Sequence, residues 1–121
     1  SEYLLRKFAE NSISTEELEK LQESVLLLLT NPQYLEWQGS ATVIRNEAWI
    51  MTDEQNLLRP DKIFELEEVV VIIDFKTGEL KEQDHQQLKR YVELLKAIYG
   101  ASRSIESYLY YTYNSSFIRC D

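Results

Sequence analysis

The chemically reactive residues of this sequence gather at the end of one apolar run. Asp74 follows five β-branched residues, Val69 to Ile73, and Lys76 lies two positions further on. Because alternate residues of a strand point to the same face of its sheet, Asp74 and Lys76 should emerge side by side. A carboxylate beside an ammonium group can bind a cation, orient a water molecule and neutralise a developing negative charge. These are the elements of hydrolytic chemistry.

Asp61 joins this pair if the preceding strand forms a hairpin with the apolar one. A hairpin that turns at Glu67–Glu68 places Asp61 directly opposite Asp74, with Cβ atoms about 4.5–5.5 Å apart. A longer turn over Glu65–Glu68 makes the two residues diagonal neighbours on the same face, whereas a one-residue bulge would separate them. The hairpin therefore predicts two adjacent carboxylates.

Two carboxylates this close repel each other, which raises the pKa of one of them unless both share a cation. Mg²⁺ and Mn²⁺ prefer oxygen ligands and are the expected occupants of such a site. Glu47 would add a third carboxylate if its own strand, expected over 42–51, pairs with the strand that follows Asp53–Asn56. Lys76 would then orient or deprotonate a water molecule, or neutralise an oxyanion.

The periodicity of the sequence predicts the elements that position these side chains. Pro60 cannot donate a ladder hydrogen bond, so the strand that contains it should begin at an edge or a distortion. The order of elements predicts an α/β fold with leading helices and a mixed sheet, built from a three-strand meander, a helix and a further strand. The expected helical segments are Tyr3–Glu10, a helix from the capping box Ser14-x-x-Glu17 to Asn31-Pro32, a short turn at Gln33–Gln38, and Asp84–Tyr99 with Gly100 as its C-cap. The expected strands are Thr42–Met51, Leu57–Leu66, Val69–Lys76 and Ile105–Tyr113.

Two motifs of the chain resemble a known nuclease superfamily. Arg59-Pro60-Asp61, followed by Asp74-Phe75-Lys76, resembles the PD-(D/E)xK signature. The sequence Asp-Phe-Lys-Thr-Gly, with Gln87-x-x-x-Tyr91 on the next helix, is similar to the RecB-like branch of that superfamily. This branch includes the C-terminal nuclease module of AddA- and RecB-type helicase–nucleases. The resemblance spans residues 47–112 and implies a restriction-endonuclease-like core.

The resemblance implies a metal-dependent DNA exonuclease that acts in DNA recombination and repair. Its expected cofactor is Mg²⁺ or Mn²⁺, and its expected partners are single-stranded DNA, the rest of a parent helicase and a partner subunit. A histidine that many relatives carry in the leading helices has no counterpart here, and the single cysteine, Cys120, excludes the four-cysteine iron–sulfur cluster of some relatives. Carried over by motif, the implied metal ligands are Asp61, Asp74, Glu47 and the Phe75 backbone carbonyl, the implied catalytic residues are these three carboxylates with Lys76, and Gln87 and Tyr91 close the site and contact DNA.

Several of these residues also have simpler explanations. Asp84-x-x-Gln87 matches a capping box, so Gln87 would then serve only the start of its helix. Tyr91 would equally suit a core position. The acidic segments 16–23 and 65–68 are most simply solvated surfaces. Candidate phosphate contacts are Arg59, Lys62, Lys81, Lys89 and Arg90, and the tyrosines at 108, 110, 111 and 113 would either stack bases or cover the sheet and an interface.

The composition is typical of one cytoplasmic domain with no membrane segment. The chain has 121 residues, a length that fits a single domain, with a helical leader over 1–38 and a nuclease core over 41–121. It begins Ser-Glu-Tyr and its single methionine is Met51, so we expect a fragment of a longer protein.

The net charge of −8 argues against strong DNA binding by this chain alone, because DNA affinity comes mostly from neutralised phosphates. It therefore favours a catalytic module that a larger, more basic parent supplies with DNA. Two alternatives stay open: a non-catalytic DNA-binding or docking module of the same fold, and a stand-alone nuclease of the phage or restriction type.

Overall fold

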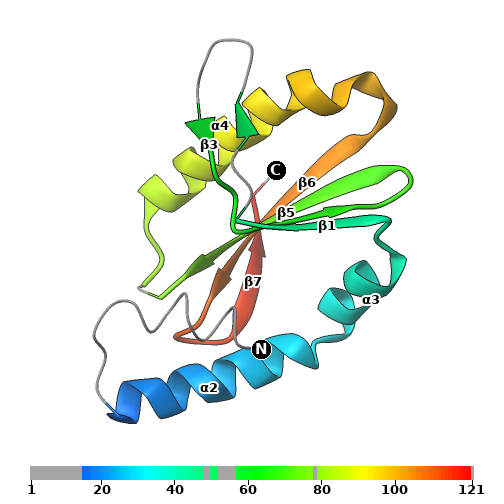
Figure 1. The fold of residues 1–121 in the computed structure, drawn as a ribbon. Coiled ribbons are helices and arrows are strands. Elements are labelled where there is room, and N and C mark those ends of the chain that lie inside the picture. Colours follow the sequence, from blue (N-terminus) through cyan, green and yellow to red (C-terminus); the bar gives the residue numbers. More distant parts are fainter. Residues whose placement is uncertain (1–14, 48–49, 52–56, 78, 121) are drawn as a thin grey trace.

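The computed structural model describes residues 15–47, 50–51, 57–77 and 79–120, and these form an α/β fold. A five-stranded mixed sheet has the order β1-β4-β5-β6-β7, and a separate two-stranded sheet pairs β2 with β3. Figure 1 shows α4 on one side of the large sheet and α2 and α3 on the other. The helices are α2 (Thr15–Leu29), α3 (Pro32–Ser40), α4 (Glu82–Tyr99) and the short 3₁₀ helix η1 (Gly100–Ser102). The strands are β1 (Val43–Asn46), β2 (Ile50–Met51), β3 (Leu57–Leu58), β4 (Lys62–Glu65), β5 (Val69–Lys76), β6 (Ser104–Tyr111) and β7 (Ser116–Arg119).

The central strand, β5, confirms the prediction from its apolar run. It spans Val69–Lys76, and the residues from Val70 to Phe75 are all buried. β-Branched residues fit such a strand because they pack well on both faces of a pleated sheet. The buried strand β5 therefore fixes the positions of Asp74 and Lys76 at its carboxyl end.

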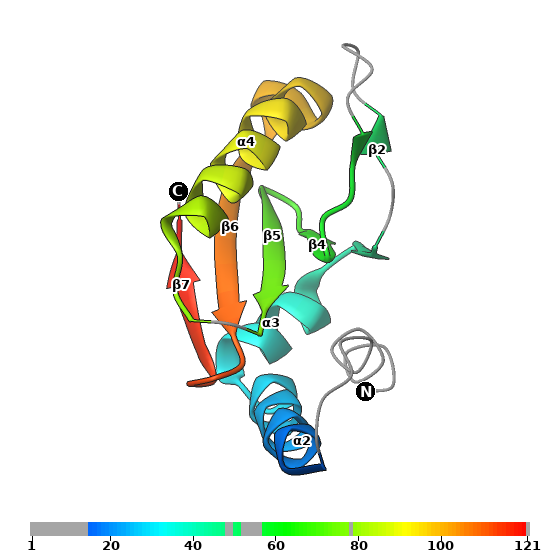
Figure 2. The same cartoon turned by 90° about the vertical axis from the view of Figure 1, so that its left-hand side faces the viewer.

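The hairpin of β4 and β5 has the register that places Asp61 opposite Asp74. The pair at the end of the β4–β5 ladder is Lys62 with Ile73, so the next step of the antiparallel register places Asp61 opposite Asp74. On the other side of β5, β6 runs parallel to it, and α4 is the connection between them. The carboxyl ends of β5 and β6 consequently lie at the same edge of the sheet, as Figure 2 shows.

Two apolar cores lie on the two faces of the sheet. One core joins α2 and α3 to Phe64, Val71 and Ile73, and the other joins α4 to Ile63 and Ile72. Since side chains alternate along a strand, Asp74 and Lys76 continue the series of Ile72 on the α4 face.

The leading helices α2 and α3 pack against one face of the large sheet. α2 buries Leu21, Val25 and Leu28 against the sheet. Asn31 caps α3 because its Oδ1 accepts hydrogen bonds from the backbone N–H groups of Gln33 and Tyr34. The structure makes this segment a helix of nine residues, longer than the expected turn. The expected helix Tyr3–Glu10 and the Ser14 cap lie outside the described residues.

The single strands expected over 42–51 and 57–66 are wrong, because each is divided in two. Glu47 adopts φ 48°, a left-handed conformation that ends β1 before β2 begins. Pro60 separates β3 from β4, which is the distortion that its missing N–H predicts. The outer pieces, β2 and β3, pair with each other instead of extending the large sheet.

The C-terminal half differs from expectation in two places. α4 begins at Glu82, two residues before the expected start, and Gly100 ends it with φ 67° as a C-cap glycine should. β6 ends at Tyr111, and β7 returns antiparallel to it as a strand that was not expected. The expected loop at 53–56 lies outside the described residues. Among the described helices, none has the length and apolar character needed to span a membrane.

Candidate active site

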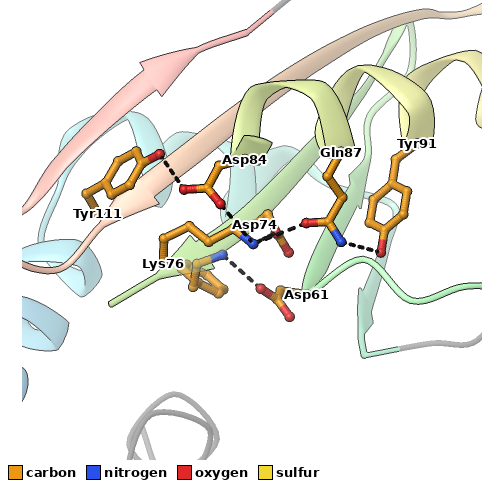
Figure 3. A network of polar contacts seen from close by, with 8 residues as sticks. Asp61, Asp74, Lys76, Asp84, Gln87, Tyr91 and Tyr111 are labelled. Atoms are coloured by element: carbon orange, nitrogen blue, oxygen red, sulfur yellow. Dashed lines mark hydrogen bonds and ion pairs between the residues drawn. The ribbon is translucent and has the colours of Figure 1, made fainter. Parts of the chain in front are cut away.

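Asp61 and Asp74 lie next to each other at the end of the β4–β5 hairpin, as predicted. Asp61 is 4% exposed and Asp74 is 8% exposed, so both carboxylates are largely withdrawn from water. The backbone N–H of Phe75 donates a hydrogen bond of 2.8 Å to Oδ2 of Asp61, which fixes that carboxylate against β5. Figure 3 shows both aspartates beside Lys76.

Lys76 is the cation that faces these carboxylates. Its Nζ lies 2.9 Å from Oδ2 of Asp74 and donates a hydrogen bond of 3.2 Å to Oε1 of Gln87. Burial lowers the pKa of Lys76, but the charge and hydrogen bond of Asp74, with the charges of Asp84 and Asp61, outweigh it, and the pKa is raised. Lys76 therefore carries a positive charge at neutral pH beside the two aspartates.

Gln87 and Tyr91 extend this network along α4, as Figure 3 shows. Nε2 of Gln87 donates a hydrogen bond of 3.4 Å to the Tyr91 hydroxyl. Burial and the negative charge of Asp74 raise the pKa of Tyr91. The capping-box explanation of Gln87 is wrong, because the N-cap of α4 is Lys81 and no side chain caps it. Both residues thus come to the same place as the aspartates.

Asp84 and Tyr111 belong to the same network and were not expected there. Oδ1 of Asp84 lies 3.9 Å from Lys76 Nζ, and the Tyr111 hydroxyl donates a hydrogen bond of 2.9 Å to Asp84 Oδ2. Burial, followed by the hydrogen bond and charge of Asp84, raises the pKa of Tyr111 to about 12. The sequence carries one usable signal: Asp84 precedes Gln87 by three positions, so the two share a helix face. Tyr111 is brought in by its pairing with Lys76 across the parallel strands.

Glu47 is placed near the aspartates through its backbone rather than its carboxylate. Its N–H donates to the Asp61 carbonyl at 3.1 Å, which continues the β1–β4 pairing by one step. Its carboxylate forms an ion pair of 3.0 Å with Arg59. Within the described residues, no group of three or more histidine, cysteine, aspartate or glutamate side chains is arranged to hold a metal ion. Glu47 and the Phe75 carbonyl as metal ligands stay predictions.

The donors that converge here fit a hard divalent cation. Asp61 and Asp74 supply carboxylate oxygens from adjacent strands, which is the ligand type that Mg²⁺ and Mn²⁺ prefer. The ammonium of Lys76 lies 2.9 Å from Asp74 and 3.9 Å from Asp84 and also experiences the charge of Asp61, so the cluster carries an excess of negative charge.

The candidate phosphate contacts separate into different environments. Lys62 lies over the rings of Tyr34 and Phe64, with Nζ 5.3 and 5.4 Å from their centroids, and so faces the α2–α3 side. Arg59 is engaged by Glu47. The remaining three, Lys81, Lys89 and Arg90, are exposed at or near the start of α4.

The tyrosine cluster and the acidic segments also divide. Tyr110 and Tyr111 are buried on opposite faces of the sheet, Tyr108 packs against Trp37, and Tyr113 is exposed. The expectation that Glu65 is solvated is wrong. It is buried because Arg45 and Arg103 bind its two carboxylate oxygens at 2.8 and 3.2 Å. These two arginines supply the compensation that a buried carboxylate requires.

Comparison with known proteins adds no family to this description. No family model matches the chain, and no curated protein matches it. The residues themselves and their arrangement therefore carry what can be inferred about function.

Proposed function

We propose that this chain is a metal-dependent DNA nuclease domain of the RecB-like PD-(D/E)xK type, with a restriction-endonuclease-like core. The observation that carries the proposal is the convergence of Asp61, Asp74 and Lys76 at the end of β5, with Gln87 and Tyr91 of α4 directly beside them. The motifs are spread over residues 61–91, and the fold brings all five side chains to one location.

Asp61 and Asp74 are the residues that would hold Mg²⁺ or Mn²⁺. A bound divalent cation there would supply positive charge to the scissile phosphate and lower the pKa of a water molecule. Asp61 is prepared for this role because its hydrogen bond from Phe75 fixes its orientation before any cation arrives. Fixed donors and ligands avoid reorganisation during the reaction.

Lys76 has the role of stabilising negative charge as the phosphodiester bond is hydrolysed. It is held as an ammonium group between Asp74 and Gln87, so its position is restricted to one side of the carboxylate pair. Gln87 orients this group because its amide accepts from Lys76 and donates to Tyr91. Loss of Gln87 should therefore affect the geometry of Lys76 before it affects the fold.

The resemblance to the RecB-like branch suggests the substrate and setting, and the charge of the chain is consistent with a module that is supplied with DNA. The chain has a net charge of −8, and its site is itself acidic, so its own attraction for DNA is weak. We propose that a parent ATP-dependent helicase delivers single-stranded DNA to this cytoplasmic module, and that the pathway served is DNA recombination or repair.

One observation favours the alternative of a non-catalytic module. The Lys76–Asp74 pair is already closed at 2.9 Å, and Glu47 is occupied by Arg59, as in a cluster that only stabilises a fold. Metal binding separates the two functions, because a purely structural ion pair has no need of a divalent cation. Mn²⁺ titration calorimetry on the wild type makes this comparison.

The proposal is tested by assaying hydrolysis of single-stranded DNA in the presence and absence of Mg²⁺. Asp74→Ala should lower the rate by at least ~100-fold, since it removes a ligand and the partner of Lys76. The matched control is Glu36→Ala, which removes an exposed carboxylate from α3 on the opposite face and should retain full activity. Equal Mg²⁺-dependent activity in wild type and Asp74→Ala would exclude this site as the source of the activity.

A further inference from the structure

Asp84 has a geometry that the start of a helix does not require. It lies in the first turn of α4, but the cap position belongs to Lys81, and Asp84 is turned toward the strands. Its two oxygens contact two strand residues: Oδ1 faces Lys76 Nζ at 3.9 Å, and Oδ2 accepts the Tyr111 hydroxyl at 2.9 Å (Figure 3). Its side chain is 17% exposed, so it belongs to the interior of the site.

Asp74 has two potential partners that exclude each other. Its Oδ2 now binds the ammonium of Lys76 at 2.9 Å, and the proposed function requires the same carboxylate for a divalent cation. Two cations on one carboxylate repel each other strongly in a buried site. Lys76 must therefore have a second acidic partner within reach if it is to stay in the site as a charged group.

We propose that Asp84 is a positioning residue that takes over the ammonium of Lys76 when Asp74 binds a divalent cation, and that Tyr111 holds Asp84 in place for this exchange. This inference rests on the proposed function, because it describes how the same site accommodates its cation. Lys76 would retain its hydrogen bond to Gln87 throughout, and only its ion-pair partner would change.

The surroundings of Tyr111 make it a rigid support. It is fully buried, and its strand position is fixed opposite Lys76 in the parallel pairing of β5 and β6. Its ring contacts Tyr113 with a centroid separation of 5.8 Å. Because the hydroxyl comes from a fixed ring, its hydrogen bond restricts Asp84 to the orientation in which the other oxygen faces Lys76.

The exchange has a measurable consequence for metal affinity. Without Asp84 the carboxylates that remain around the ammonium are Asp74 and Asp61, the two residues that would hold the cation, so the ammonium stays with them and competes with the incoming cation. Asp84→Asn should therefore weaken Mn²⁺ binding, by about fivefold for a coupling at the lower end of the usual range. Tyr111→Phe, which leaves the formal charge unchanged, should weaken it in the same direction by a smaller factor.

The experiment is Mn²⁺ titration calorimetry on four proteins. Asp84→Asn and Tyr111→Phe are also measured in a Lys76→Met background. The four proteins are the wild type, Asp84→Asn, Tyr111→Phe and the control Tyr110→Phe. Tyr110→Phe removes an equivalent buried hydroxyl from the same strand, but on the α2–α3 face, where it binds Ser24. Circular dichroism verifies that each variant is folded.

The inference predicts weaker Mn²⁺ binding in Asp84→Asn and Tyr111→Phe and unchanged affinity in Tyr110→Phe. In the Lys76→Met background, the Asp84→Asn and Tyr111→Phe substitutions should each change the affinity by less than about twofold. A loss that persists in that background overturns it, because Asp84 would then act on the cation directly. Unchanged affinity in Asp84→Asn overturns it as well. If the wild type itself binds no Mn²⁺, the proposed function and this inference fail together. If the wild type binds Mn²⁺ and Asp84→Asn binds it equally well, only this inference fails.

Discussion

At the scale of single residues, each buried polar group of the site has a defined partner on its own face of the large sheet. Asp61 and Asp74 are buried and adjacent, yet each has a defined partner, the Phe75 N–H or the Lys76 ammonium. Tyr110 and Tyr111 show the same principle on opposite faces, with hydroxyl groups bound to Ser24 and Asp84. Buried polar groups that lack such a partner reduce stability.

Tyr34 has the opposite situation and supports a prediction about stability. It is fully buried, and its hydroxyl finds no hydrogen-bond partner within the described residues. Tyr34→Phe should therefore raise the free energy of unfolding by about 1 kcal/mol at neutral pH. Chemical denaturation followed by circular dichroism measures it. Tyr110→Phe is the control with the opposite sign, since it loses a satisfied hydrogen bond.

The same residue predicts a pH dependence. Burial raises the pKa of Tyr34 from 10.0 to about 12, so the unfolded chain releases this proton before the folded protein does. The ionisation of Tyr34 therefore does not affect the free energy of unfolding below pH 10, and it lowers that free energy progressively as the pH rises toward 12. Tyr34→Phe should thus gain further on the wild type across that interval. A stability difference that stays constant over the interval would contradict the assignment.

At the scale of elements, the sequence was most informative where one interaction dominates. β5 followed from five β-branched residues, and the β4–β5 register is one of the two that the sequence left open, the one with the short turn at Glu67–Glu68. The division of β1 from β2 depends on the positive φ of Glu47, which no residue preference indicates. The approach of Tyr111 to Asp84 joins residues 27 positions apart, so the local pattern could not reveal it, whereas β7 is the second strand of a short hairpin with β6 and was missed.

The end of α4 provides a prediction at this scale, with a matched control in α3. Gly100 has φ 67°, and a Cβ there would meet no atom within 4 Å, so the backbone conformation alone determines the effect of a substitution. Gly100→Ala should lower the free energy of unfolding by about 1–2 kcal/mol. Gly39 is in a helix and equally open, so Gly39→Ala should raise it by about 0.5–1 kcal/mol. Thermal unfolding compares them, and equal signs would be inconsistent with this explanation.

At the scale of the whole molecule, the crowded carboxylates of the site lower the free energy of unfolding when no cation is bound. Asp61→Asn can still accept the Phe75 N–H but removes one of the crowded negative charges. In the presence of EDTA this variant should be more stable than the wild type by about 1 kcal/mol.

Addition of Mg²⁺ should reverse that order. A ligand that binds only the folded state stabilises it by ~2.7 kcal/mol at one hundred times its Kd, and the wild type alone retains both aspartates. Thermal melting with and without Mg²⁺ gives the comparison. A wild type and Asp61→Asn that respond equally to Mg²⁺ would place the cation elsewhere.

The parallel pairing of β5 with β6 also has a consequence for the order of folding. The β4–β5 hairpin joins residues close in sequence, so Asp61 and Asp74 can meet early. Tyr111 lies opposite Lys76 across the parallel pairing, and the chain between these two residues includes all of α4. Contacts between distant segments form slowly because they require a large loop to close. The hydrogen bond between Tyr111 and Asp84 should therefore form late. The two aspartates would then be adjacent before Asp84 is in place to bind the ammonium of Lys76.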